Sequence, residues 1–275
     1  MNNFDVLILE DKICIIIMQT GVSVYDFRFD NLFCCRRPYE ITDTVEAIAR
    51  IGAIDKYQDL YESLKDRNIV LINNPKEHRM ASELTDWYPL IEDLTPKSQW
   101  FNHIPTVMEI TSNFDFPIFI KGSRQTSKHD EKLSIARSKN DLEYILNEYY
   151  KNDILHWQKL VCREYVNISP VKYTLSSYKV TPGFEFRTFW LNGDLVGAGH
   201  YWSGFCKYDW DEEQKIKALK IAQQAVDKLQ VPFLVVDLAL TVDNNWIVIE
   251  CNDGQESGYA GISPIGMWNQ ILDKI

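Results

Sequence analysis

Two neighbouring apolar segments carry polar side chains in positions where a buried strand normally has hydrophobic ones. Asp237 interrupts FLVVDLAL in its middle, and Glu250 and Asn252 stand two positions apart in WIVIECNDG. Positions two apart in a strand share a face, so Glu250 and Asn252 would point the same way. The turn sequence DNN between the segments predicts a hairpin that brings Asp237 roughly opposite Glu250. Three oxygen donors gathered in this way suit a hard cation such as Mg²⁺.

A structural interpretation of the same residues is equally open. A carboxylate inside a strand must be paired, protonated or bound to a cation, because burial of an unpaired charge is costly. Asp237 and Glu250 would then be satisfied by an arginine or by backbone amides instead of a metal ion.

Basic side chains occupy two further strand-like segments. Lys121 ends FPIFIK and leads into a loop that begins with Gly122, which is typical of a phosphate contact, although many lysines end strands by reaching into water. Arg187 lies among aromatic residues in FEFRTFW, where a guanidinium usually has an anion to bind. The alternative for Arg187 is a structural pair with Glu185 or Glu164.

The first hundred residues alternate strand-like and helix-like segments. Strands are predicted over 4–10, 12–18 and 68–75, and helices over 42–67, with a break at Gly52, and over 76–94. This alternation predicts an α/β layer with a largely parallel sheet.

After Pro96 the pattern changes to that of an α+β unit with antiparallel hairpins. We expect strands in 116–121, 155–168, 184–202, 232–242 and 244–252, and helices over 138–151 and 211–230. Ser138 is a candidate N-cap, and Asn192-Gly193 is a strong hairpin turn.

Composition narrows the class of protein. The chain has 275 residues, 45% hydrophobic and 25% charged, with a formal net charge of -10. This acidic balance, without a long Lys/Arg run, argues against a nucleic-acid partner. The longest apolar run, ICIIIM, is too short to span a membrane. The six cysteines show no CxxC spacing, so we interpret them as reduced thiols of a cytoplasmic protein.

The order of these segments resembles the ATP-grasp superfamily. The matching strings are FPIFIKG, LVCREYV, FEFRTFWLNGDLVGA, VVDLAL and WIVIECNDG. The hairpin and the E-x-N end are similar to those of the ribosomal-protein glutamate ligase group, and the whole chain looks closer to a poorly characterised bacterial and phage clade. The resemblance implies an α/β (α+β) chain in which an α/β pre-ATP-grasp domain, 1–98, precedes an ATP-grasp domain, 99–275. The N-lobe would cover about 99–165 and the C-lobe about 166–275.

The resemblance also implies roles for single residues. Lys121 would contact the ATP phosphates, with Arg124 supplying further positive charge, and Arg187 would reach the γ-phosphate. Glu164, Tyr165 and Val166 would form the hinge beside adenine. Asp237, Glu250 and Asn252 would hold one or two Mg²⁺ ions. Asp253 and Gly254 would start a loop that faces the acceptor, and residues 122–130 would form a lid.

Three features depart from the pattern of the superfamily. Many of its ligases carry an arginine two positions before the metal-binding aspartate, where this chain has Val235. The lid segment holds only one glycine, Gly122, and no acid after Val166 is an obvious partner for ribose hydroxyls.

The resemblance implies an ATP- and Mg²⁺-dependent carboxylate–amine (or carboxylate–thiol) ligase that works through an acyl-phosphate. The acceptor would be an amino acid, a peptide or a protein tail. Two alternatives stay open: an ATP-binding pseudoenzyme acting as a regulatory module, favoured by Val235 and the glycine-poor lid, and an ATP-grasp kinase that phosphorylates without ligation.

Overall fold

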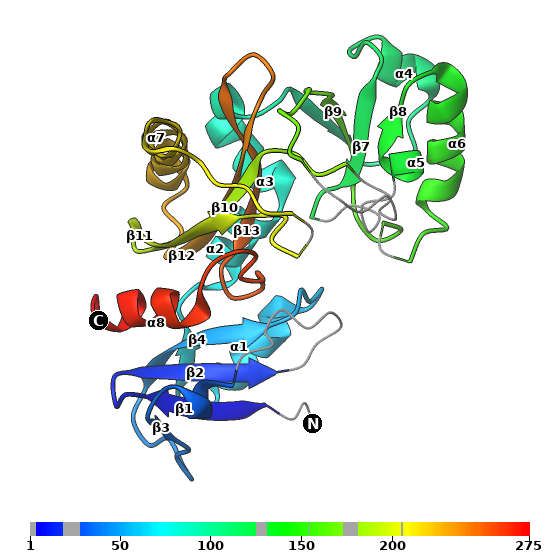
Figure 1. The fold of residues 1–275 in the computed structure, drawn as a ribbon. Helices are drawn as coiled ribbons and strands as arrows, with labels where there is room; N and C mark the ends of the chain where they lie inside the picture. Colours follow the sequence, from blue (N-terminus) through cyan, green and yellow to red (C-terminus); the bar gives the residue numbers. More distant parts are fainter. Residues whose placement is uncertain (1–3, 19–27, 125–130, 154, 173–180, 205) are drawn as a thin grey trace.

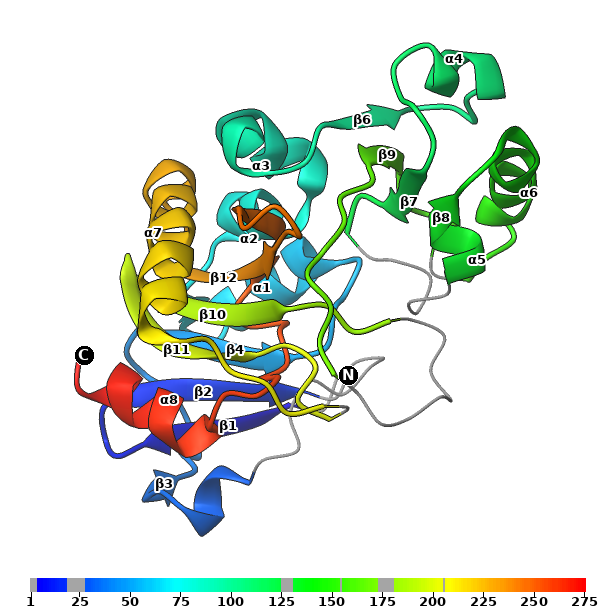
Figure 2. The same cartoon turned by 45° about the horizontal axis from the view of Figure 1, so that its top comes forward.

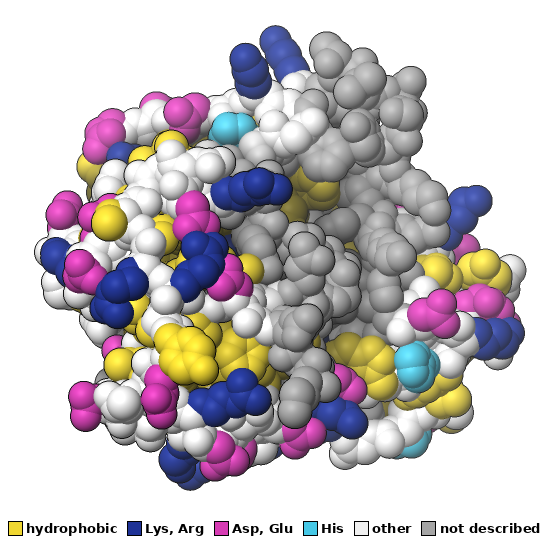
Figure 3. All heavy atoms as spheres, turned by 90° about the horizontal axis from the view of Figure 1, so that it is seen from below, with side chains coloured by type: hydrophobic (Ala, Val, Ile, Leu, Met, Phe, Trp, Pro, Cys, Tyr) yellow, Lys and Arg dark blue, Asp and Glu magenta, His cyan; other side chains and the backbone are white. Residues whose placement is uncertain are grey.

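The chain folds around three β-sheets, seen from two directions in Figures 1 and 2. A computed structural model describes residues 4–18, 28–124, 131–153, 155–172, 181–204 and 206–275. The described part of the chain contains no helix that is long and apolar enough to cross a membrane. On the face shown in Figure 3, acidic and basic side chains are interspersed.

The N-terminal sheet has the strand order β3-β1-β2-β4-β5. Its members are β1 (Asp5–Leu9), β2 (Ile13–Met18), β3 (Cys35–Arg36), β4 (Val45–Ile51) and β5 (Ile69–Leu71), with α1 (Tyr57–Lys65) between the last two. Pairs β2–β4 and β4–β5 are parallel, but β1 pairs antiparallel with both β2 and β3. The expected largely parallel sheet is therefore mixed. The short loop between β1 and β2, with Glu10 and Asp11 at positive φ, permits only a hairpin.

The helix predicted over 42–67 is wrong in its first half, where β4 forms. Five consecutive residues of β4, from Ala47 to Ile51, are buried, as in a central strand covered on both faces. Its alanine and glutamate favour a helix locally, and tertiary packing overrides that preference. The second half is helical as predicted, because α1 occupies 57–65.

The helices α2 (Pro75–Ser82) and α3 (Leu84–Ile91) lead from this sheet to the second one. Asn74 caps α2 in a capping box with Glu77, and Pro75 takes the first helical position. The asparagine-proline sequence that marks the end of β5 is thus also the start signal of α2.

The second sheet has the order β6-β9-β7-β8 and is antiparallel throughout. It comprises β6 (Ser98–Phe101), β7 (Ile118–Gly122), β8 (Ile135–Ala136) and β9 (Leu160–Glu164), with α4 (Val107–Thr111), α5 (Glu131–Ser134) and α6 (Lys139–Tyr149). Its core packs α6 against β7 through Leu142, Ile145 and Ile120. The Ser138 side chain accepts a hydrogen bond from the Asp141 N–H, which confirms the predicted N-cap of α6.

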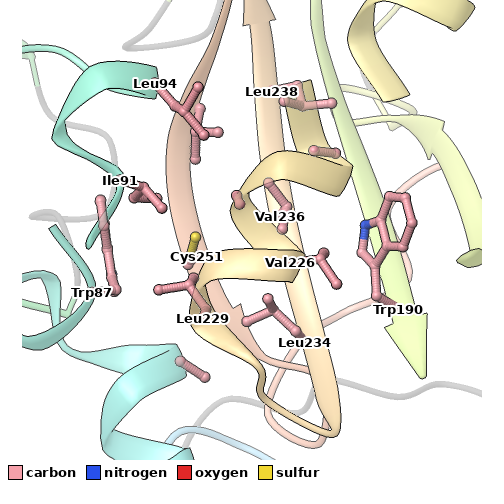
Figure 4. Close-up of a cluster of buried hydrophobic side chains, with 14 of the residues drawn as sticks. Trp87, Ile91, Leu94, Trp190, Val226, Leu229, Leu234, Val236, Leu238 and Cys251 are labelled. Atoms are coloured by element: carbon pink, nitrogen blue, oxygen red, sulfur yellow. The ribbon is translucent and has the colours of Figure 1, made fainter. Parts of the chain in front are cut away.

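The third sheet, ordered β11-β10-β12-β13, is also antiparallel. It contains β10 (Glu185–Leu191), β11 (Asp194–His200), β12 (Phe233–Leu240) and β13 (Trp246–Asp253), with α7 (Glu212–Leu229) and α8 (Pro264–Leu272). Figure 4 shows α7 packed on one face of this sheet, with Val226 and Leu229 near Val236, and with Trp87 and Ile91 of α3 beside them. The opposite face packs on α8 and the N-terminal sheet (Figure 1).

Candidate functional site

The predicted metal ligands and Arg187 form one row across three strands. The register pairs Arg187 of β10 with Asp237 of β12, and Asp237 with Glu250 of β13. Val235 is opposite Asn252 in the same ladder. The hairpin geometry expected from the sequence, with Asp237 opposite Glu250, is confirmed. Because cross-strand partners point to the same face, one side of the sheet gathers these charges.

Arg187 and Asp237 make a bidentate ion pair. Arg187 Nε donates to Asp237 Oδ1 at 2.8 Å, and Nη2 donates to Oδ2 at 2.6 Å. The third guanidinium nitrogen, Nη1, donates to the Gly258 carbonyl at 3.0 Å, and the Tyr201 ring lies 5.0 Å from Arg187 Cζ. The structural partner of Arg187 is therefore Asp237, and neither Glu185 nor Glu164. A planar guanidinium fits the two oxygens of a directly opposite carboxylate.

Lys121 joins the second sheet to the third. Its ammonium group donates to Glu250 Oε1, although β7 and β13 belong to different sheets. Only 3% of the Lys121 side chain is exposed. Burial favours the neutral form of Glu250, but the charges of Lys121 and Arg187 outweigh it, so the pKa of Glu250 is lowered. Glu250 is thus held as an anion between two cations.

A cavity of about 450 Å³ lies beside these pairs, between the second and third sheets. Six of the predicted site residues line it: Lys121, Glu164, Tyr165, Val166, Asp237 and Glu250. Apolar side chains, including Phe119, Ile135 and Ile249, cover part of its wall. The cavity therefore combines an apolar region with a charged one, as small-molecule sites commonly do.

Asn252 and Arg187 do not line the cavity themselves but flank its charged end. The amide nitrogen of Asn252 is buried and has no hydrogen bond of good geometry among the residues that the structure describes. Within those residues, no group of three or more His, Cys, Asp or Glu is placed to hold a metal ion. A metal site here depends on two carboxylates and an amide, an oxygen-donor set that suits Mg²⁺.

Arg124 is directed away from the cavity. Its Nη2 donates to Glu256 Oε2 at 2.9 Å, and its Nη1 donates to the Ile54 carbonyl at 2.8 Å. Glu256 also lies 3.0 Å from His78 Nε2, so the three side chains form a buried cluster against the N-terminal sheet. A cofactor contact through Arg124 stays a prediction, and the lid segment 125–130 that follows it lies outside the described residues.

The turn after β13 faces the N-terminal sheet. Asp253 is fully buried, and its Oδ1 accepts a hydrogen bond from the Gln255 N–H at 2.8 Å. Gly254 packs so closely on the Phe233 ring that an added Cβ would lie 2.6 Å from it. This close packing is the reason for glycine at position 254. The turn that was expected to face an acceptor therefore begins as a packed contact.

Arg163 is a cavity residue that sequence reasoning missed. Its Nη1 donates to the Ile249 carbonyl at 2.6 Å, and its Nη2 donates to Thr95 Oγ1 at 2.6 Å. Burial lowers the pKa of Arg163 to about 10, while the negative charge of Glu250 opposes that shift. Arg163 thus fixes the backbone next to Glu250. The signal was a charged residue inside the apolar strand LVCRE.

Glu185 is the second missed residue, a further carboxylate of the cavity beside Asp237 and Glu250. Its Oε1 accepts a hydrogen bond from Trp202 Nε1 at 2.9 Å. Burial raises the pKa of Glu185 to about 7, and the charges of Asp237 and Glu250 add to the shift. The signal was its position two residues before Arg187, which puts both side chains on one face of β10.

The three sheets and the cavity between two of them define the ATP-grasp class of proteins. A family model described as an ATP-grasp domain, the third family of one ATP-grasp clade, matches residues 85–271. Because the match covers more than half of the chain, the chain belongs to this family. No curated protein sequence matches it.

Solved structures show the same fold. The VanG D-Ala:D-Ser ligase of Enterococcus faecalis is 18% identical, with a TM-score of 0.60 over 91% of this chain and 77% of that one. The RimK domain protein ATP-grasp of Sphaerobacter thermophilus is 12% identical, with a TM-score of 0.55 over 78% and 74%. The D-alanine–D-alanine ligase of Bacillus anthracis, solved with ATP, is 14% identical, with a TM-score of 0.55 over 83% and 78%. These relatives are ligases or ATP-grasp proteins, and the expected superfamily and fold class are confirmed.

Proposed function

We propose that this chain is an ATP- and Mg²⁺-dependent carboxylate–amine ligase. The observation that carries the proposal is the pair of buried cation–carboxylate contacts, Lys121–Glu250 and Arg187–Asp237, beside one cavity. Such a site has cations that can face phosphate oxygens and carboxylates that can face a metal ion. Membership of the ATP-grasp family and the ligases among its structural neighbours support the same activity.

The apolar part of the cavity suits the base of the nucleotide. Tyr165 and Val166 directly follow β9, where their backbone can contact adenine, and Phe119 and Ile249 offer apolar surface to a flat ring. Glu185 supplies the acid for ribose hydroxyls that was not apparent from the sequence, because its carboxylate lies in the same cavity. A carboxylate accepts hydrogen bonds from hydroxyl groups.

Mg²⁺ fits the residues present. Asp237 and Glu250 are cross-strand partners, and Asn252, next on the same face, has a buried amide with an unsatisfied nitrogen among the described residues. We propose these three as the residues that hold the ion. When bound, Mg²⁺ would neutralise negative charge on the phosphate groups.

The missing arginine at position 235 has a substitute on the neighbouring strand. Val235 is fully buried, while Arg187 of β10 reaches the same carboxylate, Asp237, from the adjacent ladder position. Arg187 thus supplies a guanidinium where the departure from the superfamily pattern removed one. This weakens the case that Val235 makes for a binding-only module.

The proposed reaction follows from these positions. An oxygen of the substrate carboxylate attacks the γ-phosphorus of ATP, the bond to the ADP oxygen breaks, and an acyl-phosphate forms. Lys121 and Arg187 stabilise the charge that spreads over the transferred group, which is the main contribution proteins make to phosphoryl transfer. An amine then attacks the carbonyl carbon, phosphate leaves, and the amine nitrogen loses a proton. The acceptor is an amino acid, a peptide or a protein tail.

Product analysis tests this function. Purified protein is incubated with Mg-ATP and pools of amino acids and peptides, ADP release is measured, and products are weighed by mass spectrometry. A ligase gives ADP and an amide. A phosphorylated product without an amide would select the kinase alternative, and saturable ATP binding without ADP would select the regulatory module.

Substitution of the carboxylates tests the assignment of the site. Asp237→Asn and Glu250→Gln should each lower turnover by about 10²–10³, because each removes a charge that stabilises the transferred phosphate through the metal. Asp243→Asn is the matched control, since Asp243 is exposed in the turn of the same β12–β13 hairpin. Turnover that both site variants retain at the level of Asp243→Asn would exclude these carboxylates as metal ligands.

A further inference from the structure

The Glu185 carboxylate is held in place by a neighbouring tryptophan. Trp202 follows the end of β11, and its indole Nε1–H donates to Glu185 Oε1 at 2.9 Å. Both residues line the cavity, and both are largely buried, with 9% of Glu185 and 7% of Trp202 exposed. A hydrogen bond to an ionised group in such surroundings is stronger than an exposed one.

The backbone around the pair fixes the indole relative to the carboxylate. The Tyr208 hydroxyl donates to the Glu185 carbonyl at 2.6 Å and accepts from the Trp202 N–H at 3.2 Å. The Tyr201 N–H donates to the same Glu185 carbonyl at 2.9 Å. Trp202 is therefore tied to Glu185 through its backbone as well as through its side chain.

Gly183 closes the other side of the carboxylate. A Cβ at this position would lie 2.7 Å from Glu185 Oε1 and 2.6 Å from Ile168 Cγ2, closer than side-chain carbons approach. The Gly183 N–H also forms a hydrogen bond with the Glu185 carboxylate. The carboxylate thus lies between a glycine that leaves room for it and an indole that donates to it.

We propose that Trp202 is a positioning residue that orients the Glu185 carboxylate toward the two hydroxyls of a ribose. It thereby makes the cavity selective for ribonucleotides over deoxyribonucleotides. The inference rests on the proposed nucleotide site. The indole N–H occupies Oε1 from one side, so the plane of the carboxylate is set before a nucleotide enters. A buried polar group that is aimed at a hydroxyl discriminates strongly against a ligand that lacks it.

Calorimetric titration with Mg-ATP and Mg-dATP tests the proposal. The wild-type protein should bind ATP at least about tenfold more tightly than dATP, since one hydrogen bond to a charged group is at stake. Trp202→Phe should lower the affinity for ATP by about tenfold and leave that for dATP nearly unchanged, so that the selectivity is lost. A defect that was only structural would weaken both nucleotides alike.

Two further variants make the test specific. Trp190→Phe is the matched control, because Trp190 is a buried tryptophan of the same sheet whose Nε1 donates to Thr188 Oγ1, away from the cavity. It should keep the selectivity of the wild type. Gly183→Ala leaves Trp202 intact but pushes the carboxylate aside, and it should lose the selectivity even where Trp202→Phe folds poorly.

The outcomes separate the inference from the function on which it rests. Wild-type protein that binds neither nucleotide overturns the nucleotide site and the inference together. Wild-type protein that binds ATP and dATP equally, or a folded Trp202→Phe variant that keeps the wild-type preference, overturns the role of Trp202 alone.

Discussion

At the scale of single residues, charge pairing dominates the cavity. Lys121, Arg187, Asp237 and Glu250 satisfy one another in two buried pairs, whereas Glu185, among the described residues, has neutral hydrogen-bond donors and two carboxylates nearby. A buried carboxyl without a cationic partner favours its protonated form. Glu185 should therefore be the site residue that responds most to pH.

The pKa of Glu185 makes a prediction about stability. Burial raises it from 4.5 to about 7, so between these values the folded state binds more protons than the unfolded state. The free energy of unfolding consequently falls as pH rises through this window, by up to about 3 kcal/mol. Glu185→Gln should remove this dependence and gain stability relative to the wild type toward higher pH.

Urea unfolding from about pH 5 to about pH 8 measures the effect. Glu143→Gln, which changes an exposed carboxyl on α6, is the control and should follow the wild type. Parallel curves for the wild type and Glu185→Gln would show that Glu185 does not titrate in this window.

At the scale of elements, the site depends on strands that belong to different sheets. Lys121 and Arg163 reach from β7 and β9 to β13, and Asn73 reaches from the end of β5 to β12. The Asn73 Oδ1 accepts from the Phe233 N–H at 2.9 Å, and the Asn73 Nδ2 donates to the Phe233 carbonyl at 2.8 Å. Asn73 therefore imitates a strand partner for the start of β12.

Asn73→Ala should destabilise the protein by about 1–3 kcal/mol, because the buried Phe233 N–H loses its acceptor. Asn140→Ala, at an exposed position of α6, should change stability far less. Thermal and urea unfolding measure both variants. Equal stability of the two would show that the Asn73 contact adds nothing to the junction of β5 and β12.

The same scale explains what the sequence could predict. The β12–β13 register followed from alternation and a turn signal, which are local properties, and Ser138 as a cap of α6 was local too. Strand β4 was missed because its helix-forming residues are overruled by burial between neighbouring strands. Arg163 and Arg124 find their partners 86 and 132 residues away, so no local pattern could assign those contacts.

Glu185 shows the same limit within the site. Its spacing to Arg187 was visible, but a salt bridge between them was the simplest interpretation. The bidentate fit of Arg187 to Asp237 across the ladder leaves Glu185 to Trp202 and to the cavity. The departure at Val235 was visible as well, while its compensation from β10 needed the register of the third sheet.

At the scale of the whole molecule, the cavity joins two sheets that carry opposite halves of the Lys121–Glu250 contact. In the proposed nucleotide complex the phosphates face Lys121 and Arg187, and Mg²⁺ faces Asp237 and Glu250. Either ligand alone would break an ion pair and leave one buried charge without compensation, which costs several kcal/mol. Nucleotide and metal ion should therefore bind together, with a coupling that is reciprocal.

Calorimetric titration of ATP with and without Mg²⁺ tests this central claim most directly. We expect saturable binding at one site with Mg²⁺, an affinity for ATP at least about tenfold lower without it, and little dependence on Mg²⁺ in Glu250→Gln. Asp243→Asn, with its exposed carboxyl, should behave like the wild type. ATP binding of equal affinity with and without Mg²⁺ in the wild-type protein would contradict the account.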